Sequence, residues 1–251
     1  MKKYDSVLFD LDGTLTDSGP GITKSVAQAF TRMGMEPPCQ KELNLFVGPP
    51  LTSSFARYGM NPTQVDEAIR LFRQRYTTVG KFENIPYDGV QHLLSRLQIA
   101  GYRLFVATSK PENVAIEVLQ HFKLDGYFEK ICGASLDHSR ETKEAVLEYL
   151  KQQCHLGKAI MIGDTQFDVN GAKEHGIPCI GVTWGYGNEK SMRDAGAIAI
   201  ASTMDELYRL IDQEADAALS SRTSYICSLE ICTIGSPFLW LIASPPKLSS
   251  S

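Results

Sequence analysis

Two aspartates stand directly after a short apolar run near the start of the chain. Residues 7–9 (Val-Leu-Phe) lead into Asp10 and Asp12, and Gly13 follows. An ionised carboxylate at the end of a buried strand must be paired, protonated or bound to a metal, since burying an isolated charge is costly. Residues two apart in an extended strand face the same way, so we expect roughly 6 to 7 Å between the two carboxylates, with room for a small group and a cation. The alternative is an Asp-Gly turn that closes the strand.

A second acidic pair follows another apolar run. Residues 159–162 (Ala-Ile-Met-Ile) lead toward Asp164, and Asp168 comes one helical turn later, so both carboxylates can lie on one face at the start of a helix. Asp164 could instead cap that helix. Mg²⁺ prefers hard oxygen ligands and binds few carboxylates. The sequence therefore predicts a magnesium site formed by Asp10, Asp12 and Asp164.

Two hydroxyls and a lysine complete the set of candidate residues. The run 104–107 ends at Thr108, whose hydroxyl and neighbouring amides would face an anion held at the strand ends. Ser109 is a second candidate, although its spacing to Glu112 equally fits a capping box. Lys143 opens a later helix, and taken alone it would be a solvated surface lysine. Together with the aspartates, these residues predict a metal-dependent phosphoryl site, because an anionic nucleophile approaches a phosphate only when charge is neutralised.

The elements that must position these residues alternate along the second part of the chain. From residue 87 onward, helical patterns alternate with the apolar runs 104–107, 159–162 and 179–182. Such alternation predicts an α/β fold, a doubly wound, Rossmann-like parallel sheet with helices on both faces. Ligands of such sheets bind at the carboxyl ends of the strands, near the point where the strand order reverses.

The chain divides into three parts by pattern. Residues 1–16 and 85–213 are predicted to form the α/β core. Residues 17–84 show no strong strand pattern; helices are expected from about residue 22, over 43–58 and over 62–79, as a small all-helical cap domain. Residues 214–251 are serine-rich, with an apolar patch at 238–242 too short to span a bilayer, and we expect a disordered tail outside the core.

Composition limits the class of protein. The 251 residues are 43% hydrophobic and 22% charged, as in a soluble folded protein, and a net charge of −4 argues against a nucleic-acid partner. The first residues do not form an export segment, so a cytoplasmic location without a membrane span is expected. Six cysteines show no metal-binding spacing and are expected to be reduced thiols. The oligomeric state is not predicted.

These motifs resemble the haloacid dehalogenase superfamily of hydrolases, in its phosphoglycolate phosphatase-like branch with a helical cap after the first motif. The resemblance covers residues 1–211 or so. The matching stretches are 9–18, 107–111, Lys143, and Gly163-Asp164 with Asp168, and residues 181–187 resemble the segment after the last motif of that branch.

The resemblance implies a mechanism. Asp10 would attack phosphorus and form an aspartyl-phosphate. Asp12 would protonate the leaving oxygen, then activate water, and would offer its backbone carbonyl to the metal. Residues 16–18 would form a flexible link that lets the cap close.

The resemblance also implies the binding residues and leaves the substrate open. Thr108 and Lys143 would hold phosphoryl oxygens, and Asp164 would bind Mg²⁺ with Asp168 in support.

A phosphoglycolate phosphatase-like enzyme acting on a small phosphate ester is the first interpretation. The alternatives are a 5'-nucleotidase-type phosphatase, a β-phosphoglucomutase-like phosphomutase and, in another class, a receiver-like or degenerate phosphate-binding module. A dehalogenase is disfavoured because it has no use for the acid at position 12. The loop 46–51 is a hypothetical specificity element over the site, or else a simple connector between helices.

Overall fold

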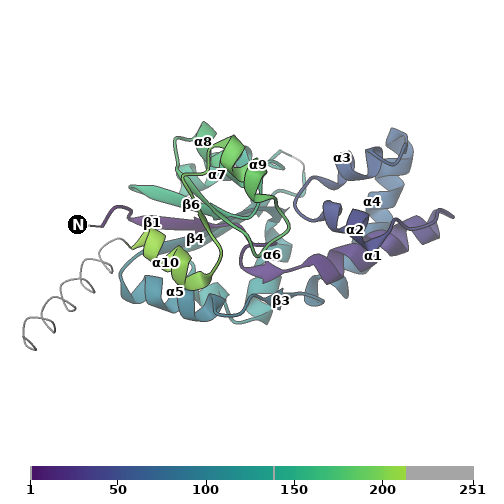
Figure 1. The fold of residues 1–251 in the computed structure, drawn as a ribbon. Coiled ribbons are helices and arrows are strands. Elements are labelled where there is room, and N and C mark those ends of the chain that lie inside the picture. The colour runs from purple at the N-terminus through teal and green to yellow at the C-terminus, as the bar shows by residue number, and fades with distance from the viewer. Residues whose placement is uncertain (1, 138, 213–251) are drawn as a thin grey trace, which may run out of the picture. The chain divides into compact units, whose positions relative to one another are not determined.

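The structure is a computed structural model and describes residues 2–137 and 139–212. A six-stranded sheet forms the centre of this part of the chain (Figure 1). Every neighbouring pair of its strands is parallel, in the order β5-β4-β1-β6-β7-β8. The chain builds from β1 outward to β4 and β5, then returns to the other side of β1, so the strand order reverses there. The strands are β1 (Ser6–Phe9), β4 (Arg103–Pro111), β5 (Lys130–Ala134), β6 (Ala159–Gly163), β7 (Cys179–Val182) and β8 (Ala199–Ala201).

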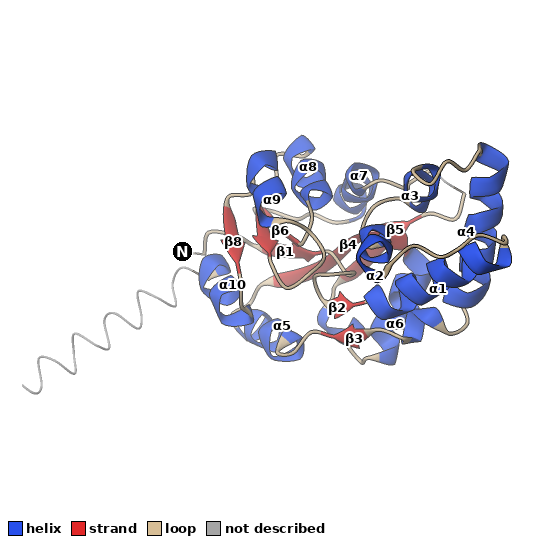
Figure 2. Ribbon diagram, turned by 45° about the vertical axis from the view of Figure 1, so that its right-hand side comes forward, coloured by secondary structure: helices blue, strands red, loops and turns tan. Residues whose placement is uncertain are grey.

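Helices cover both faces of this sheet (Figure 2), so the predicted doubly wound α/β fold is confirmed. All four residues of β1 are buried, as expected for a parallel strand covered on both sides. One face carries α7 (Lys143–Gln153), α8 (Gln166–Glu174) and α9 (Glu189–Ala195); the other carries α5 (Val90–Ile99), α6 (Glu112–His121) and α10 (Met204–Ile211), and a short 3-10 turn, η3 (Asp125–Tyr127), precedes β5.

Strand register places the end of β1 beside the end of β6 and beside the middle of β4, which continues to Pro111. Phe9, the last residue of β1, lies opposite Val106 of β4 and Ile162 of β6. Leu8 and Phe105 are fully buried in the core under α7 and α8. Asp10, Thr108 and Asp164 lie one or two residues beyond these aligned positions and therefore emerge at one edge of the sheet, next to a tightly packed core.

A helical insertion, residues 19–82, separates β1 from β4. Its two ends are tied by a short antiparallel pair, β2 (Thr16–Asp17) and β3 (Ile85–Pro86). Phe30, Phe46, Phe55 and Tyr58 form an aromatic cluster inside it, with ring centroids 5.1–6.3 Å apart. The insertion comprises α1 (Gly19–Arg32), α2 (Gln40–Leu43), η1 (Asn44–Phe46), α3 (Leu51–Ala56), α4 (Pro62–Tyr76) and η2 (Gly80–Phe82). Among the described residues the prediction of no strand over 17–84 holds except at Asp17, the last residue of β2. That this insertion is a separate cap domain stays a prediction.

Several local expectations were wrong. The helix expected over 43–58 is broken at residues 47–50, where Gly48 has a φ of +101° and two prolines follow. That backbone conformation cannot continue a right-handed helix. The strands β5 and β8 were missed, because β5 mixes a lysine and a glycine with apolar residues and β8 has only three residues, so neither carries a clear pattern.

Two further expectations concern membranes and thiols. Within residues 2–137 and 139–212, no helix is long and apolar enough to cross a membrane. Cys39, Cys132, Cys154 and Cys179 are free, as predicted. The remaining cysteines, and the tail predicted over 214–251, lie outside the described residues.

Candidate active site

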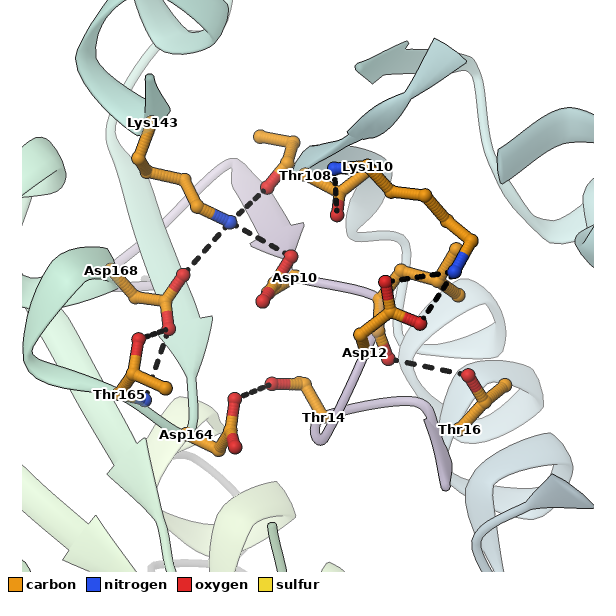
Figure 3. Close-up of polar contacts among 12 residues, drawn as sticks. Asp10, Asp12, Thr14, Thr16, Thr108, Lys110, Lys143, Asp164, Thr165 and Asp168 are labelled. Atoms are coloured by element: carbon orange, nitrogen blue, oxygen red, sulfur yellow. Dashed lines mark hydrogen bonds and ion pairs between the residues drawn. The ribbon is translucent and has the colours of Figure 1, made fainter. Parts of the chain in front are cut away.

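Five of the predicted residues gather at the carboxyl edge of the sheet (Figure 3). They come from the ends of three neighbouring strands and from the first turns of two helices on one face. All five are buried. They are Asp10 after β1, Thr108 in β4, Lys143 at the start of α7, Asp164 after β6 and Asp168 in the first turn of α8.

Lys143 joins two of the carboxylates. Its Nζ lies 2.8 Å from Asp10 Oδ1 and 2.8 Å from Asp168 Oδ1, and it donates a 2.8 Å hydrogen bond to the carbonyl oxygen of Ala107. Burial lowers the pKa of Lys143, but the two carboxylates outweigh it and raise that pKa above its usual value. Lys143 is therefore a charged, buried group of the site and not a surface lysine.

Asp168 is held by the start of its own helix. Its Oδ2 accepts hydrogen bonds from the Thr165 backbone N–H (3.0 Å) and hydroxyl (2.8 Å). Thr165, and not Asp164, is the N-cap of α8, so the capping interpretation of Asp164 was wrong. Asp164 instead accepts from the Thr14 hydroxyl at Oδ1 (3.4 Å) and from the Tyr186 backbone N–H at Oδ2 (2.8 Å).

Two glycines let the chain close around Asp164. Gly13 has a φ of +86°, and a Cβ there would lie 2.2 Å from Asp164 Oδ2. A Cβ on Gly185 would lie 2.3 Å from the same oxygen. The turn after β1 and the segment after β7 thus approach this carboxylate at distances that only glycine permits.

The acidic cluster has the properties of a metal site. One oxygen from each of Asp10, Asp164 and Asp168 lies within 4.8 Å of the others. Burial raises the pKa of Asp10 to about 6 against the opposing effect of Lys143, and burial, with Asp168 next, raises the pKa of Asp164 well above its usual value. Apart from the ion pair with Lys143, Asp10 Oδ1 and Asp168 Oδ1 have no hydrogen-bond partner among the described residues. Three carboxylates facing one ammonium fit a divalent cation.

Asp12 lies outside this cluster. Both of its carboxylate oxygens accept hydrogen bonds from Lys110 Nζ, at 2.8 and 2.9 Å. Asp10 and Asp12 contact different lysines, and between them β1 ends at Phe9 and the Leu11 carbonyl accepts several backbone N–H groups of a tight turn. The shared face expected for the two carboxylates stays a prediction. Each carboxylate has its own lysine, so any metal contact of Asp12 would come from its backbone.

The hydroxyl residues of β4 differ in their positions. Thr108 is buried, and its Oγ1 accepts a 3.2 Å hydrogen bond from the Lys110 backbone N–H. Ser109 is half-buried within the strand. The capping box of Ser109 with Glu112 was wrong, because the N-cap of α6 is Pro111. Sequence reasoning missed Lys110, although a lysine two residues after Thr108 at a strand end was a readable signal.

Comparison with known proteins identifies the family. Residues 7–182 match the family model described as haloacid dehalogenase-like hydrolase. The chain belongs to the haloacid dehalogenase-like hydrolases. A 5'-nucleotidase of Pseudomonas aeruginosa is 41% identical over 194 residues, 76% of this chain and 88% of that protein. Tyrosine-protein kinase PtkA of Mycobacterium tuberculosis is 40% identical over 80% of this chain and 70% of its own, and phosphoglycolate phosphatase 1 of P. aeruginosa is 26% identical over 85% and 82%.

Comparison with solved structures supports the same family. A predicted phosphatase from Clostridium acetobutylicum superposes with a TM-score of 0.79 at 44% identity, covering 83% of this chain and 98% of its own. The M. tuberculosis PtkA structure gives 0.74 at 39% identity, covering 83% and 98%. This haloacid dehalogenase-like hydrolase is therefore an enzyme of the phosphatase type, and the receiver-like alternative is excluded.

Proposed function

We propose that this enzyme hydrolyses small phosphate monoesters with bound Mg²⁺ through a phosphorylated Asp10. One observation carries the proposal. The Asp10 carboxylate ends the central strand, buried, with one oxygen 2.8 Å from the Lys143 ammonium and within one acidic cluster with Asp164 and Asp168. A carboxylate so placed has a cation on one side to offset a phosphate, and a second oxygen available as nucleophile.

The reaction then has two steps. Asp12, whose two oxygens both accept hydrogen bonds from Lys110 in this structure, first takes one proton from solvent. Asp10 Oδ2 then forms a bond to phosphorus while the bond to the ester oxygen breaks, and Asp12 gives that oxygen its proton. Asp12, now ionised, takes a proton from water, which attacks the phosphorus of the acyl phosphate and releases inorganic phosphate and free Asp10. Lys143 and Thr108 would hold phosphoryl oxygens in both steps, and Ser109 is a further candidate beside them.

The metal site follows from the same cluster. Asp10 and Asp164 would hold Mg²⁺, with the backbone carbonyl of Asp12 as the further ligand that the family resemblance implies. When bound, Mg²⁺ neutralises charge on the phosphoryl group. Both oxygens of Asp168 already face Thr165 and Lys143, so Asp168 would support the site by fixing the lysine.

A nucleophile variant tests the chemistry. Asp10→Asn is expected to abolish turnover of p-nitrophenyl phosphate, while Asp66→Asn, an exposed aspartate of α4, retains it. Chelation is expected to stop the wild-type reaction and added Mg²⁺ to restore it. Substantial turnover by Asp10→Asn, or chelator-resistant hydrolysis by the wild type, would contradict the proposal.

Two substrate classes have support. Phosphoglycolate is the substrate that the family resemblance implies, and a relative at 26% identity carries that name. Nucleoside 5'-monophosphates are the second candidate, because the relative named 5'-nucleotidase is 41% identical. A panel with Mg²⁺ should contain both, together with phosphotyrosine and β-glucose 1-phosphate. A kcat/KM at least tenfold higher for one class assigns the substrate, and isomerisation without phosphate release would indicate a phosphomutase.

A further inference from the structure

Lys110 is a second buried lysine at the sheet edge, and its partners come from two parts of the chain. Its ammonium donates to both carboxylate oxygens of Asp12 and to the hydroxyl of Tyr76, the last residue of α4. The same ammonium lies 4.8 Å from the centroid of the Tyr76 ring. Figure 3 shows Lys110 reaching over Asp12 from β4. A residue of the helical insertion thus touches the lysine that holds Asp12.

The burial of this group argues for a specific role. The side chains of Lys110 and Asp12 are 3% and 13% exposed, and Tyr76 is 6% exposed. Buried ion pairs contribute little net stability, because desolvation cancels most of the attraction. Their clearest benefit is a fixed geometry for the groups involved, and here the fixed group is the carboxylate proposed to protonate the leaving oxygen.

We propose that Lys110 and Tyr76 are positioning residues for Asp12. Through Tyr76, the orientation of the Asp12 carboxylate depends on the position of α4. The inference rests on the proposed function, since it needs Asp12 as the proton donor. While Tyr76 contacts Lys110, its hydroxyl fixes the ammonium, and when one oxygen of Asp12 carries the proton to be delivered the ammonium still holds the other. When α4 moves away, Lys110 gains freedom and the carboxylate loses its orientation. Proton delivery to the leaving oxygen is thereby coupled to contact between the insertion and the sheet.

Leaving-group acidity separates this role from a merely structural one. Cleavage of p-nitrophenyl phosphate needs little protonation, because p-nitrophenol is a strong acid for a phenol; phenyl phosphate, of similar size, needs far more. The ratio of their kcat/KM values therefore reports the proton donor, since kcat/KM includes the step in which the leaving oxygen departs. A variant that only loosens the fold lowers both values alike.

The decisive variant is Tyr76→Phe, which keeps the ring and removes one hydroxyl. We expect kcat/KM for phenyl phosphate to fall about tenfold and that for p-nitrophenyl phosphate less than about twofold. Lys110→Met should show the same selectivity, and Lys110→Arg should recover part of it. Equal losses on both substrates, no loss, or a gain would overturn the inference.

Two controls match the change. Tyr58→Phe removes a tyrosine hydroxyl from the aromatic cluster of the insertion. Glu117→Gln breaks another polar contact between the insertion and the core, the ion pair of Glu117 in α6 with Lys81 in η2, without touching Asp12. Both are expected to leave the substrate ratio unchanged. If Glu117→Gln shifts the ratio as much as Tyr76→Phe does, general loosening of the insertion is the cause and the inference fails.

A double mutant separates this inference from the proposed function. Asp12→Asn alone should lower phenyl phosphate cleavage selectively, and adding Tyr76→Phe should then have no further effect on the ratio. If Asp12→Asn shows no selectivity, Asp12 is not the donor and the proposed function loses that role. If Asp12→Asn is selective and Tyr76→Phe still acts independently of it, only the positioning role is overturned.

Discussion

Two buried lysines stand at the same sheet edge, and they differ in what surrounds them. Both side chains are 3% exposed, and each lies 2.8 Å from a carboxylate oxygen. Lys143 contacts groups supplied by β1, β4 and α8, all packed on the sheet. Lys110 contacts the turn after β1 and the helical insertion. The proposed nucleophile, Asp10, is thus positioned by the α/β core, while the proposed proton donor, Asp12, is positioned partly by the insertion.

The charge balance of the two clusters also differs. Around Lys143, the three carboxylates of Asp10, Asp164 and Asp168 face one ammonium, which leaves negative charge for a cation. Around Lys110, one carboxylate and one hydroxyl share the ammonium, so the charges cancel. A metal is therefore expected only in the first cluster. Asp10 and Asp12 belong to different clusters even though they are only two residues apart in the sequence.

Removing each lysine in turn is the strongest test of this difference. Lys143→Met is expected to lower kcat/KM for p-nitrophenyl phosphate by about 10²–10³-fold, because it removes a positive charge beside the transferring phosphoryl group. Lys110→Met should cost less than about threefold on this substrate, which needs little protonation. Steady-state kinetics with saturating Mg²⁺ measure both. Similar losses for the two variants would mean that the clusters do not have separate tasks.

Metal-dependent stability tests the charge balance. At a Mg²⁺ concentration 100 times its Kd, the free energy of unfolding should rise by about 2.7 kcal/mol in the wild type. Asp164→Asn should remove most of this gain, and Asp12→Asn should keep it, since the Asp12 side chain faces Lys110. Urea unfolding with and without Mg²⁺ gives the comparison. Loss of the gain in Asp12→Asn would return its side chain to the metal site.

The first cluster was predictable from sequence because it depends on strand ends. Asp10 and Asp164 each follow an apolar run, and parallel strands bring such positions to one edge. Lys143 could be assigned only through its place between the motifs, since a lysine at a helix start carries no sign of burial.

The second cluster was not predictable in the same way. Lys110 and Asp12 are 98 residues apart, and Lys110 and Tyr76 are 34 apart. Their contacts depend on the turn after Phe9 and on where the last residue of α4 lies relative to β4, and neither leaves a periodic pattern in the sequence. In the sequence, Tyr76 is one of several apolar residues on one face of an amphipathic helix, so the pattern predicts only that it is buried.

Gly48, in the loop between η1 and α3, lies close to Thr165 at the start of α8, so the insertion also approaches the first cluster. A Cβ on Gly48 would lie 3.3 Å from Thr165 Cγ2, whereas a Cβ on Gly59 meets nothing within 4 Å. Both glycines have positive φ, so alanine at either position should cost about 1 kcal/mol of stability. We expect only Gly48→Ala to change the ranking of phosphate substrates. An unchanged ranking would make the loop a plain connector.

The smallest expected effect tests whether the support of Asp168 matters to the first cluster. Thr165→Ala removes a hydroxyl that donates to Asp168, and Thr203→Ala removes a comparable N-cap contact at α10, away from the site. Each should lower the free energy of unfolding by about 1 kcal/mol in urea. Only Thr165→Ala should also lower kcat/KM several-fold, because a freer Asp168 holds Lys143 less firmly against Asp10. Equal kinetics for the two variants would mean that Lys143 keeps its place through Asp10 and Ala107 alone.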